Sequence, residues 1–175
     1  MQRFLSEENI TLHRDYVRVK RLKYSIIESS VSALKDADIG EIFRMKIDSR
    51  DKRDAITLLS EIKLHEIFFS SFSDSPYPRS ESVANGYGNE ANFLNLLYKE
   101  AMALPYGFIL VYQLGQRIEV KRTYAFPSAL RYTYPSLAID VCEHAYFMDY
   151  GFDKERYLVS LLPYLNIALL SVTDK

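Results

Sequence analysis

The residues best placed to do chemistry in this chain are its three histidines, His13, His65 and His144. Asp140 stands four residues before the last of them. Imidazole nitrogen and carboxylate oxygen together form a donor set that suits a redox-active first-row metal such as iron or manganese. Because the histidines come from separated segments, a site built from them requires a fold that brings those segments together.

The residues alone leave a second interpretation open for each member of this set. His65 lies within the apolar stripe of a predicted helix, so it also fits a buried histidine satisfied by a hydrogen bond. Asp140 and His144 have a spacing that is common in structural roles, and His13 lies near the surface end of a predicted helix. Spacing therefore suggests a metal site without establishing one.

The first half of the chain has the periodicity of helices. Ser6 before an acidic first turn predicts a helix start. His13, Val17 and Arg21 then recur every four residues, which predicts that they share one helix face. The predicted segments are a helix over 6–34, the turn of a helical hairpin within 36–47, a helix over 51–72, a linker over 73–88 and a helix over 89–104.

The second half has the pattern of strands followed by short helices. A glycine-containing turn at 114–116 separates two apolar or alternating runs, which predicts a β-hairpin. The predicted segments are strands over 106–113, 117–124 and 136–141, a helix over 143–150 stopped by Gly151, and a last helix over 153–172.

These segments predict an α+β fold. We expect an N-terminal long helical hairpin followed by an α/β lobe with a three-stranded antiparallel sheet flanked by helices. The expected domains are a helical hairpin domain over 1–85 and an α/β domain over 86–175, with the metal site between the two.

Composition excludes several classes of protein. The chain has 175 residues, of which 48% are hydrophobic, and this supports a packed core. A net charge of −1 gives no general attraction to nucleic acid or to an anionic membrane. Cys142 is the single cysteine, and the N-terminal residues lack the apolar segment of a signal peptide. We therefore expect a cytoplasmic protein that binds neither nucleic acid nor membrane.

Four stretches of the sequence carry a family resemblance. Residues 138–158, AIDVCEHAYFMDYGFDKERYL, resemble the D-V-W-E-H-A-Y-Y signature of the iron/manganese superoxide dismutases. Residues 5–13, LSEENITLH, look like that family's S-x-E-T-L-x-x-H. Residues 64–69, LHEIFF, look like its N-H-x-x-F-W, and residues 106–108, YGF, resemble its S-G-W.

This resemblance implies a complete metal site and a reaction. His13, His65, Asp140 and His144 would be the protein ligands of one iron or manganese ion per subunit, with a solvent molecule as a further ligand. The implied activity is antioxidant: superoxide is converted to oxygen and hydrogen peroxide. The family also pairs subunits through the glutamate beside the last histidine, so we expect a homodimer held through Glu143 and His144.

Around this ligand set the sequence departs from the family pattern. Val17 and Arg21 replace a histidine and a tyrosine of the substrate gateway, and Cys142 replaces a tryptophan. Phe147 stands where the family has a second tyrosine. The active-site glutamine is absent both at Glu61, its position in the iron type, and near 124–126, its position in the manganese type. The sequence therefore does not choose iron over manganese.

Three further residues are predicted to act in catalysis. Glu61 would hydrogen-bond the bound solvent, carry protons or bind the metal, and the other interpretation is a surface glutamate. Arg21 would guide an anion to the site or would pair with a nearby carboxylate. Tyr146 is the tyrosine that the signature retains.

Two alternatives to an active dismutase stay open. In one, the protein is a metal-binding homologue with weak or no dismutase activity and another redox role. In the other, it keeps the fold with inert ligands. Loss of the gateway residues keeps the first alternative open, because groups around a metal tune its activity. Retention of all four ligands weighs against the second.

Overall fold

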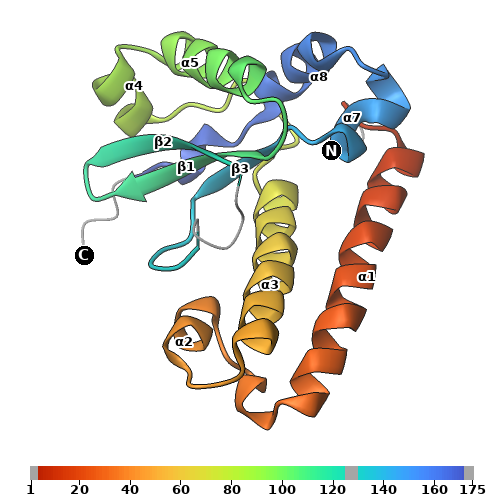
Figure 1. Cartoon of the computed structure of the whole chain (residues 1–175). Coiled ribbons are helices and arrows are strands. Elements are labelled where there is room, and N and C mark those ends of the chain that lie inside the picture. The colour runs from red at the N-terminus through yellow and green to blue at the C-terminus, as the bar shows by residue number, and fades with distance from the viewer. Residues whose placement is uncertain (1–3, 125–129, 172–175) are drawn as a thin grey trace.

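The computed structural model describes residues 4–124 and 130–171, and Figure 1 shows the course of the chain. The regular elements are helices α1 (Glu7–Ser30), α2 (Ile39–Arg44), α3 (Ser49–Ser70), α4 (Glu81–Tyr87), α5 (Glu90–Ala103), α7 (Glu143–Tyr150) and α8 (Lys154–Leu161), and strands β1 (Phe108–Leu114), β2 (Arg117–Thr123) and β3 (Leu137–Asp140). They confirm the predicted α+β fold: a long helical hairpin followed by a three-stranded antiparallel sheet flanked by helices.

Helices α1 and α3 pack against each other along the hairpin (Figure 1). The oxygen of Ser6 accepts a hydrogen bond from the backbone N–H of Asn9, so the predicted helix start is confirmed. Helix α1 ends at Ser30, earlier than the predicted 34, because Val31 leaves helical geometry and a single 3-10 turn follows. Short helix α2 fills the connection, where Asp38 and Glu41 form a reciprocal capping box.

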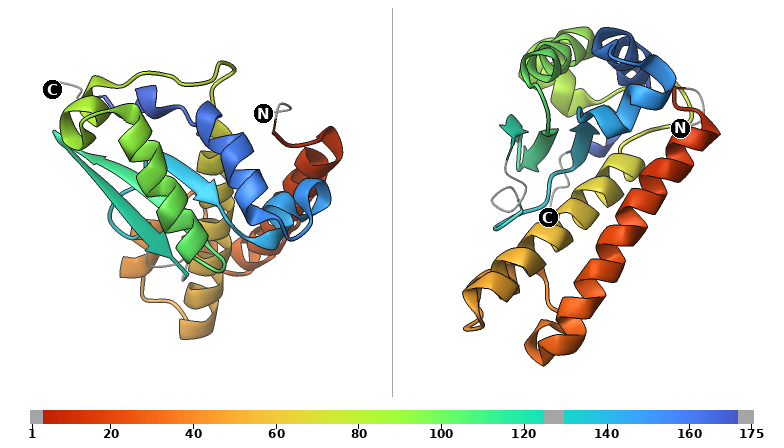
Figure 2. Two further views of the ribbon diagram at one scale, coloured as in Figure 1. Left: turned by 90° about the horizontal axis from the view of Figure 1, so that it is seen from above. Right: turned by 45° about the vertical axis from the view of Figure 1, so that its right-hand side comes forward.

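The sheet has the strand order β2-β1-β3, and both pairings are antiparallel. Phe108, at the start of β1, lies opposite Thr123 on one side and Asp140 on the other. Helices α4 and α5 contact strands β1 and β2 (Figures 1 and 2). Helix α3, of the long helical hairpin, contacts β3. Strand β3 therefore ends next to the long hairpin, at the junction where α7 begins.

Two further predicted segments differ from the structure. The predicted helix over 153–172 ends at Leu161 and gives way to two 3-10 turns, Leu162–Tyr164 and Ile167–Leu169. Pro163 explains the break, because proline has no backbone N–H to continue the helix. Val172, the predicted end, lies outside the described residues. The predicted linker over 73–88 contains helix α4, which is capped by Ser80.

Apolar side chains from both halves of the chain share one core. Fully buried members include Leu64 and Phe68 of α3, Phe93 of α5, and Phe108 and Ile139 of the sheet. This shared core connects the long hairpin to the sheet.

Within the described ranges, no helix combines the length and the apolar character needed to cross a bilayer.

Gly107 is predicted to be irreplaceable at the entry to β1. Its φ is +120°, and an added Cβ would lie 2.1 Å from the backbone oxygen of Thr123. We expect Gly107→Ala to lower the free energy of unfolding by about 3 kcal/mol or more, because both the conformation and the close approach resist a side chain. Urea denaturation followed by circular dichroism measures this loss.

Gly115→Ala is the matched control. Gly115 also has a positive φ, +61°, but an added Cβ there meets no atom within 4 Å. Gly115→Ala should lower the free energy of unfolding by only about 1 kcal/mol. Equal losses for the two variants would show that the contact with Thr123 does not matter.

Candidate metal centre

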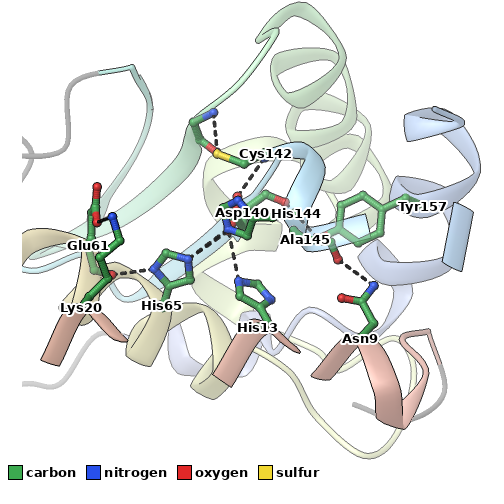
Figure 3. A network of polar contacts seen from close by, with 11 residues as sticks. Asn9, His13, Lys20, Glu61, His65, Asp140, Cys142, His144, Ala145 and Tyr157 are labelled. Atoms are coloured by element: carbon green, nitrogen blue, oxygen red, sulfur yellow. Dashed lines mark hydrogen bonds and ion pairs between the residues drawn. The ribbon is translucent and has the colours of Figure 1, made fainter. Parts of the chain in front are cut away.

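Four side chains from four elements converge at the junction of the hairpin and the sheet (Figure 3). Helix α1 supplies His13, α3 supplies His65, the end of β3 supplies Asp140, and the first turn of α7 supplies His144. One potential ligand atom from each lies within 4.8 Å of all the others. The structure therefore brings together the four residues that the sequence predicts as ligands.

The spacing of these atoms matches the edges of a coordination shell. Oδ2 of Asp140 lies 3.4 Å from Nε2 of both His13 and His65. It lies 3.1 Å from Nε2 of His144, which is 3.2 Å from Nε2 of His65. Protein ligands bind a metal at about 2.1 Å, so two ligands on one ion lie about 3.0 Å apart at a right angle and about 3.6 Å apart at 120°. These four separations fall in this range.

Two of these atoms are buried and are held by ion pairs alone. Among the described residues, Nε2 of His13 and Oδ2 of Asp140 are buried and make no hydrogen bond. A buried polar atom without a partner costs about 1–3 kcal/mol. A cation at the point on which they converge would satisfy both, so the donor set fits a metal ion.

His65 is held in the tautomer that a metal ligand needs. Its Nδ1 donates a hydrogen bond to the backbone carbonyl oxygen of Glu61 over 2.6 Å. Nε2, which faces the other three side chains, is then the ring nitrogen with a free lone pair. Burial lowers the pKa of His65 to about 4, so the ring is neutral at pH 7.

His144 shows the opposite behaviour. Burial works to lower its pKa, but the carboxylate of Asp140 outweighs burial and raises the pKa above its usual value near 6.5. For Asp140 burial acts in the other direction and would raise the pKa. The imidazoles of His144 and His13 nevertheless hold the pKa of Asp140 below its usual value. Nε2 of His144 faces both Asp140 and His65, so a proton bound there would compete with a metal ion for the same lone pair.

Two hydrogen bonds, one from a backbone N–H and one from a tyrosine hydroxyl, orient the aspartate. Oδ1 of Asp140 accepts from the backbone N–H of Cys142 over 2.8 Å. The hydroxyl of the fully buried Tyr157 donates to the Asp140 carbonyl oxygen over 2.9 Å. These bonds leave Oδ2 pointing at the histidines. They are the kind of outer contact that fixes ligand geometry in metal sites.

Asn9 ties α1 to α7 beside the centre. Its side-chain amide donates to the backbone oxygen of Ala145 over 3.3 Å and to the carboxylate of Asp149 over 2.9 Å. Asn9 is fully buried, and Asp149 also accepts from the backbone N–H of Ser6. This link holds His13 and His144 in register across two helices.

Aromatic rings wall the centre on its inner side. His13 lies 5.3 Å from the ring centre of Phe68 and 5.0 Å from that of Phe69, and Phe108 lies 5.4 Å from His65. His144 is the exposed member of the four. The apolar wall limits water on one side, while solvent reaches the centre on the side of His144.

The three residues predicted to act in catalysis have different surroundings. The carboxylate of Glu61 pairs with Lys20 over 2.6 Å. Arg21 pairs with Glu66 over 2.6 Å, which was the second interpretation of that arginine, and its side chain is largely exposed. Tyr146 is buried, and its ring stacks on Tyr157 with centres 5.0 Å apart. Their catalytic roles stay predictions. In the manganese type the active-site glutamine is expected near 124–126. Residues 125 and 126 lie outside the described residues.

Tyr16 and Lys20 face the centre from α1, and neither is among the site residues predicted from the sequence. An α-helix turns about 100° per residue, so Lys20, seven residues after His13, is about 20° from its direction, whereas Arg21 is about 80° away. The ring of Tyr16 stacks on His144 at 4.8 Å and 20°, and lies 5.3 Å from His65. The spacing from His13 indicates Lys20, whereas the family resemblance indicates Val17 and Arg21.

Comparison with known families bears on the second half of this site. The sequence profile of the iron/manganese superoxide dismutases, C-terminal domain, matches residues 78–171. This range contains Asp140 and His144, and the geometry adds His13 and His65 from the hairpin. A search of curated proteins found no match.

The pKa shifts predict how metal affinity depends on pH. Because the pKa of His144 is raised, a proton there competes with the metal at a higher pH than one on His65, whose pKa is about 4. We expect the apparent affinity for Mn(II) to fall by up to about tenfold per pH unit once the pH drops below the pKa of His144. Competition titrations at several pH values measure this. An affinity that holds down to about pH 5 and falls only near pH 4 would assign the competing proton to His65 instead.

Proposed function

Since the chain belongs to the iron/manganese superoxide dismutase family, we propose that it binds one iron or manganese ion per subunit through His13, His65, Asp140 and His144. The observation that carries this proposal is the convergence of three imidazole nitrogens on one buried carboxylate oxygen, at separations of 3.1–3.4 Å. Mixed nitrogen and oxygen ligands suit an ion that alternates between the +2 and +3 states.

We propose the family reaction for this centre: two superoxide ions and two protons become oxygen and hydrogen peroxide. A bound iron or manganese ion would supply the one-electron redox chemistry. The chain's own residues hold the site: Cys142 and Tyr157 orient Asp140, and Glu61 fixes the tautomer of His65 through its backbone oxygen. The aromatic wall of Phe68, Phe69 and Phe108 limits access to the exposed side.

A second candidate is a metal-binding homologue with weak or no dismutase activity and another redox role. One observation favours it: the groups next to the ligands are not those of the family pattern. Val17 is buried and apolar at the gateway histidine position, and the Glu61 carboxylate is held by Lys20. Changing a single outer group of a metal site typically costs about 10–100-fold in affinity or activity.

Metal loading followed by a dismutase assay separates these functions. We expect purified protein to take up about one iron or manganese ion per chain, and at least one loaded form to remove superoxide. Asp140→Ala should lose the metal, because it removes the oxygen that the three histidines face. Elemental analysis and the assay are run on the same preparations.

Each result selects one candidate. A full complement of metal without turnover in either form would select the metal-binding homologue. Failure to take up either metal would contradict both candidates and leave only the fold. The control is Asp74→Ala, which removes an exposed carboxylate from the segment between α3 and α4, away from the predicted ligands and the contacts that orient them.

We further propose a homodimer whose interface includes Glu143 and His144. Both side chains are exposed at the start of α7, and Phe147, Met148 and Phe152 expose 45%, 50% and 85% of their surface nearby. The rings of Phe147 and Phe152 also contact each other, 5.1 Å between centres. An exposed apolar group of this kind is typical of an interaction surface, and a two-fold axis would bury it against its own copy.

Light scattering after size exclusion tests the dimer. The protein should run as a dimer at micromolar concentration, and Phe147→Asp should shift it toward monomer, because a charge replaces an apolar contact at the interface. Tyr132→Asp is the matched control, since Tyr132 is 85% exposed on another segment. A wild-type monomer at micromolar concentration would refute the proposal.

A further inference from the structure

We propose that Lys20 is the anion-binding side chain of this centre, and that the carboxylate of Glu61 competes with an incoming small anion for its ammonium group. The inference rests on the proposed function, because the anion in question is the superoxide substrate. It assigns the role of electrostatic guide to a lysine within the site rather than to the predicted Arg21.

Lys20 is held in place by two groups. Its Nζ lies 2.6 Å from Oε2 of Glu61 and 4.7 Å from the ring centre of Tyr16. The side chains of Lys20 and Glu61 are 20% and 12% exposed, so the ion pair is largely but not completely withdrawn from water. The contacts with the aromatic face and with the carboxylate hold the ammonium in position.

Both groups that hold Lys20 also contact metal-ligand candidates. Tyr16 stacks on His144, and the backbone oxygen of Glu61 accepts the hydrogen bond of His65. Figure 3 shows Lys20 and Glu61 next to His65, on the side away from Asn9 and Tyr157. The ring distances place the ammonium within about 10 Å of His144, which is about one Debye length at 0.1 M salt. The ammonium is therefore close enough to act on an anion at the centre when that anion competes with the Glu61 carboxylate.

The arginines of the same helix are in a different environment. Arg18 pairs with Asp15 and is 71% exposed, and Arg21 pairs with Glu66 and is 59% exposed. Ion pairs in water are screened by salt and contribute little beyond their immediate neighbours. The field of Lys20 is screened less, because most of its side chain is buried.

The charge of Lys20 persists over the working pH range. Burial works to lower its pKa, but the carboxylate of Glu61 and the hydroxyl of Tyr16 raise the pKa above its usual value. The side chain of Lys20 therefore stays positively charged near neutral pH. When no anion is present, the Glu61 carboxylate pairs with the ammonium group of Lys20. An anion that binds Lys20 must therefore weaken this ion pair. Removing the Glu61 charge should then strengthen anion binding, and removing the Lys20 charge should weaken it.

Azide binding to the iron-loaded protein tests this inference, with the iron content measured first. We expect Lys20→Met to raise the Kd for azide roughly tenfold, since it removes one charge near the site, and Lys20→Arg to restore most of the affinity. Glu61→Gln should lower the Kd. Lys23→Met, which removes the same charge from an exposed position of α1, should leave the Kd unchanged.

A double variant guards against the cost of stranding Glu61 without its partner. Glu61→Gln/Lys20→Met should bind azide roughly tenfold more weakly than Glu61→Gln alone. Equal Kd values for these two variants would overturn the inference, as would an Arg21→Met variant that weakens azide while Lys20→Met does not. If Lys20→Met and Glu61→Gln both raise the Kd for azide, the Lys20–Glu61 ion pair is structural and the inference fails.

The proposed function and this inference fail differently. Wild-type protein that takes up no iron would overturn both. Iron-loaded protein without turnover, but with the opposite azide shifts of Lys20→Met and Glu61→Gln, would keep the inference and select the metal-binding homologue. Active protein whose azide Kd ignores both substitutions would keep the function and remove the role of Lys20.

Discussion

A carboxylate cannot stay ionised at a fully buried position unless donors or positive charge surround it. Asp140 is such a carboxylate, with no exposed surface, and the rest of the centre is organised around it. One of its oxygens is satisfied by the backbone N–H of Cys142, and the other faces three imidazoles. The arrangement is costly as a purely structural feature, because that second oxygen is held by ion pairs with the imidazoles alone and, among the described residues, neither ring nitrogen of His13 makes a hydrogen bond. A bound cation would remove that cost.

The fold places this carboxylate by joining two kinds of structure. Strand β3 ends at Asp140, opposite Phe108, so the sheet register sets the depth of the side chain. Gly107, just before Phe108, lets the backbone approach Thr123 closely where β1 begins. Helices α1 and α3 then bring His13 and His65 to the same point, and Asn9 ties α1 to α7. Stability and site geometry therefore depend on the same junction.

Much of this could be predicted from the sequence, because the information was local. The hairpin turn, the start of α1 at Ser6 and the helix Glu143–Tyr150 depend on caps, glycines and periodicity within a few residues. The four-residue set could be predicted from its donor types together with the resemblance at 138–158. Helix α4 was missed because its segment is rich in residues typical of turns, and Ser80 acts as its cap.

The surroundings of the ligands could not be predicted in the same way. Whether Lys20 or Arg21 faces the centre depends on the phase of one helix over seven or eight residues, and the two differ by about 100°. The partner of Glu61 depends on the packing of α1 on α3, since Lys20 lies 41 positions earlier in the chain. Such contacts between distant segments are decided by tertiary packing rather than by local pattern.

The central claim is that these four side chains bind one ion at a common point. X-ray diffraction from crystals of the metal-loaded protein, recorded at the absorption edge of the metal, tests it most directly. We predict one anomalous peak per chain at about 2.1 Å from Nε2 of each histidine and from Oδ2 of Asp140. A peak elsewhere on the chain, or an ion bound by fewer than three of the four residues, would contradict the account.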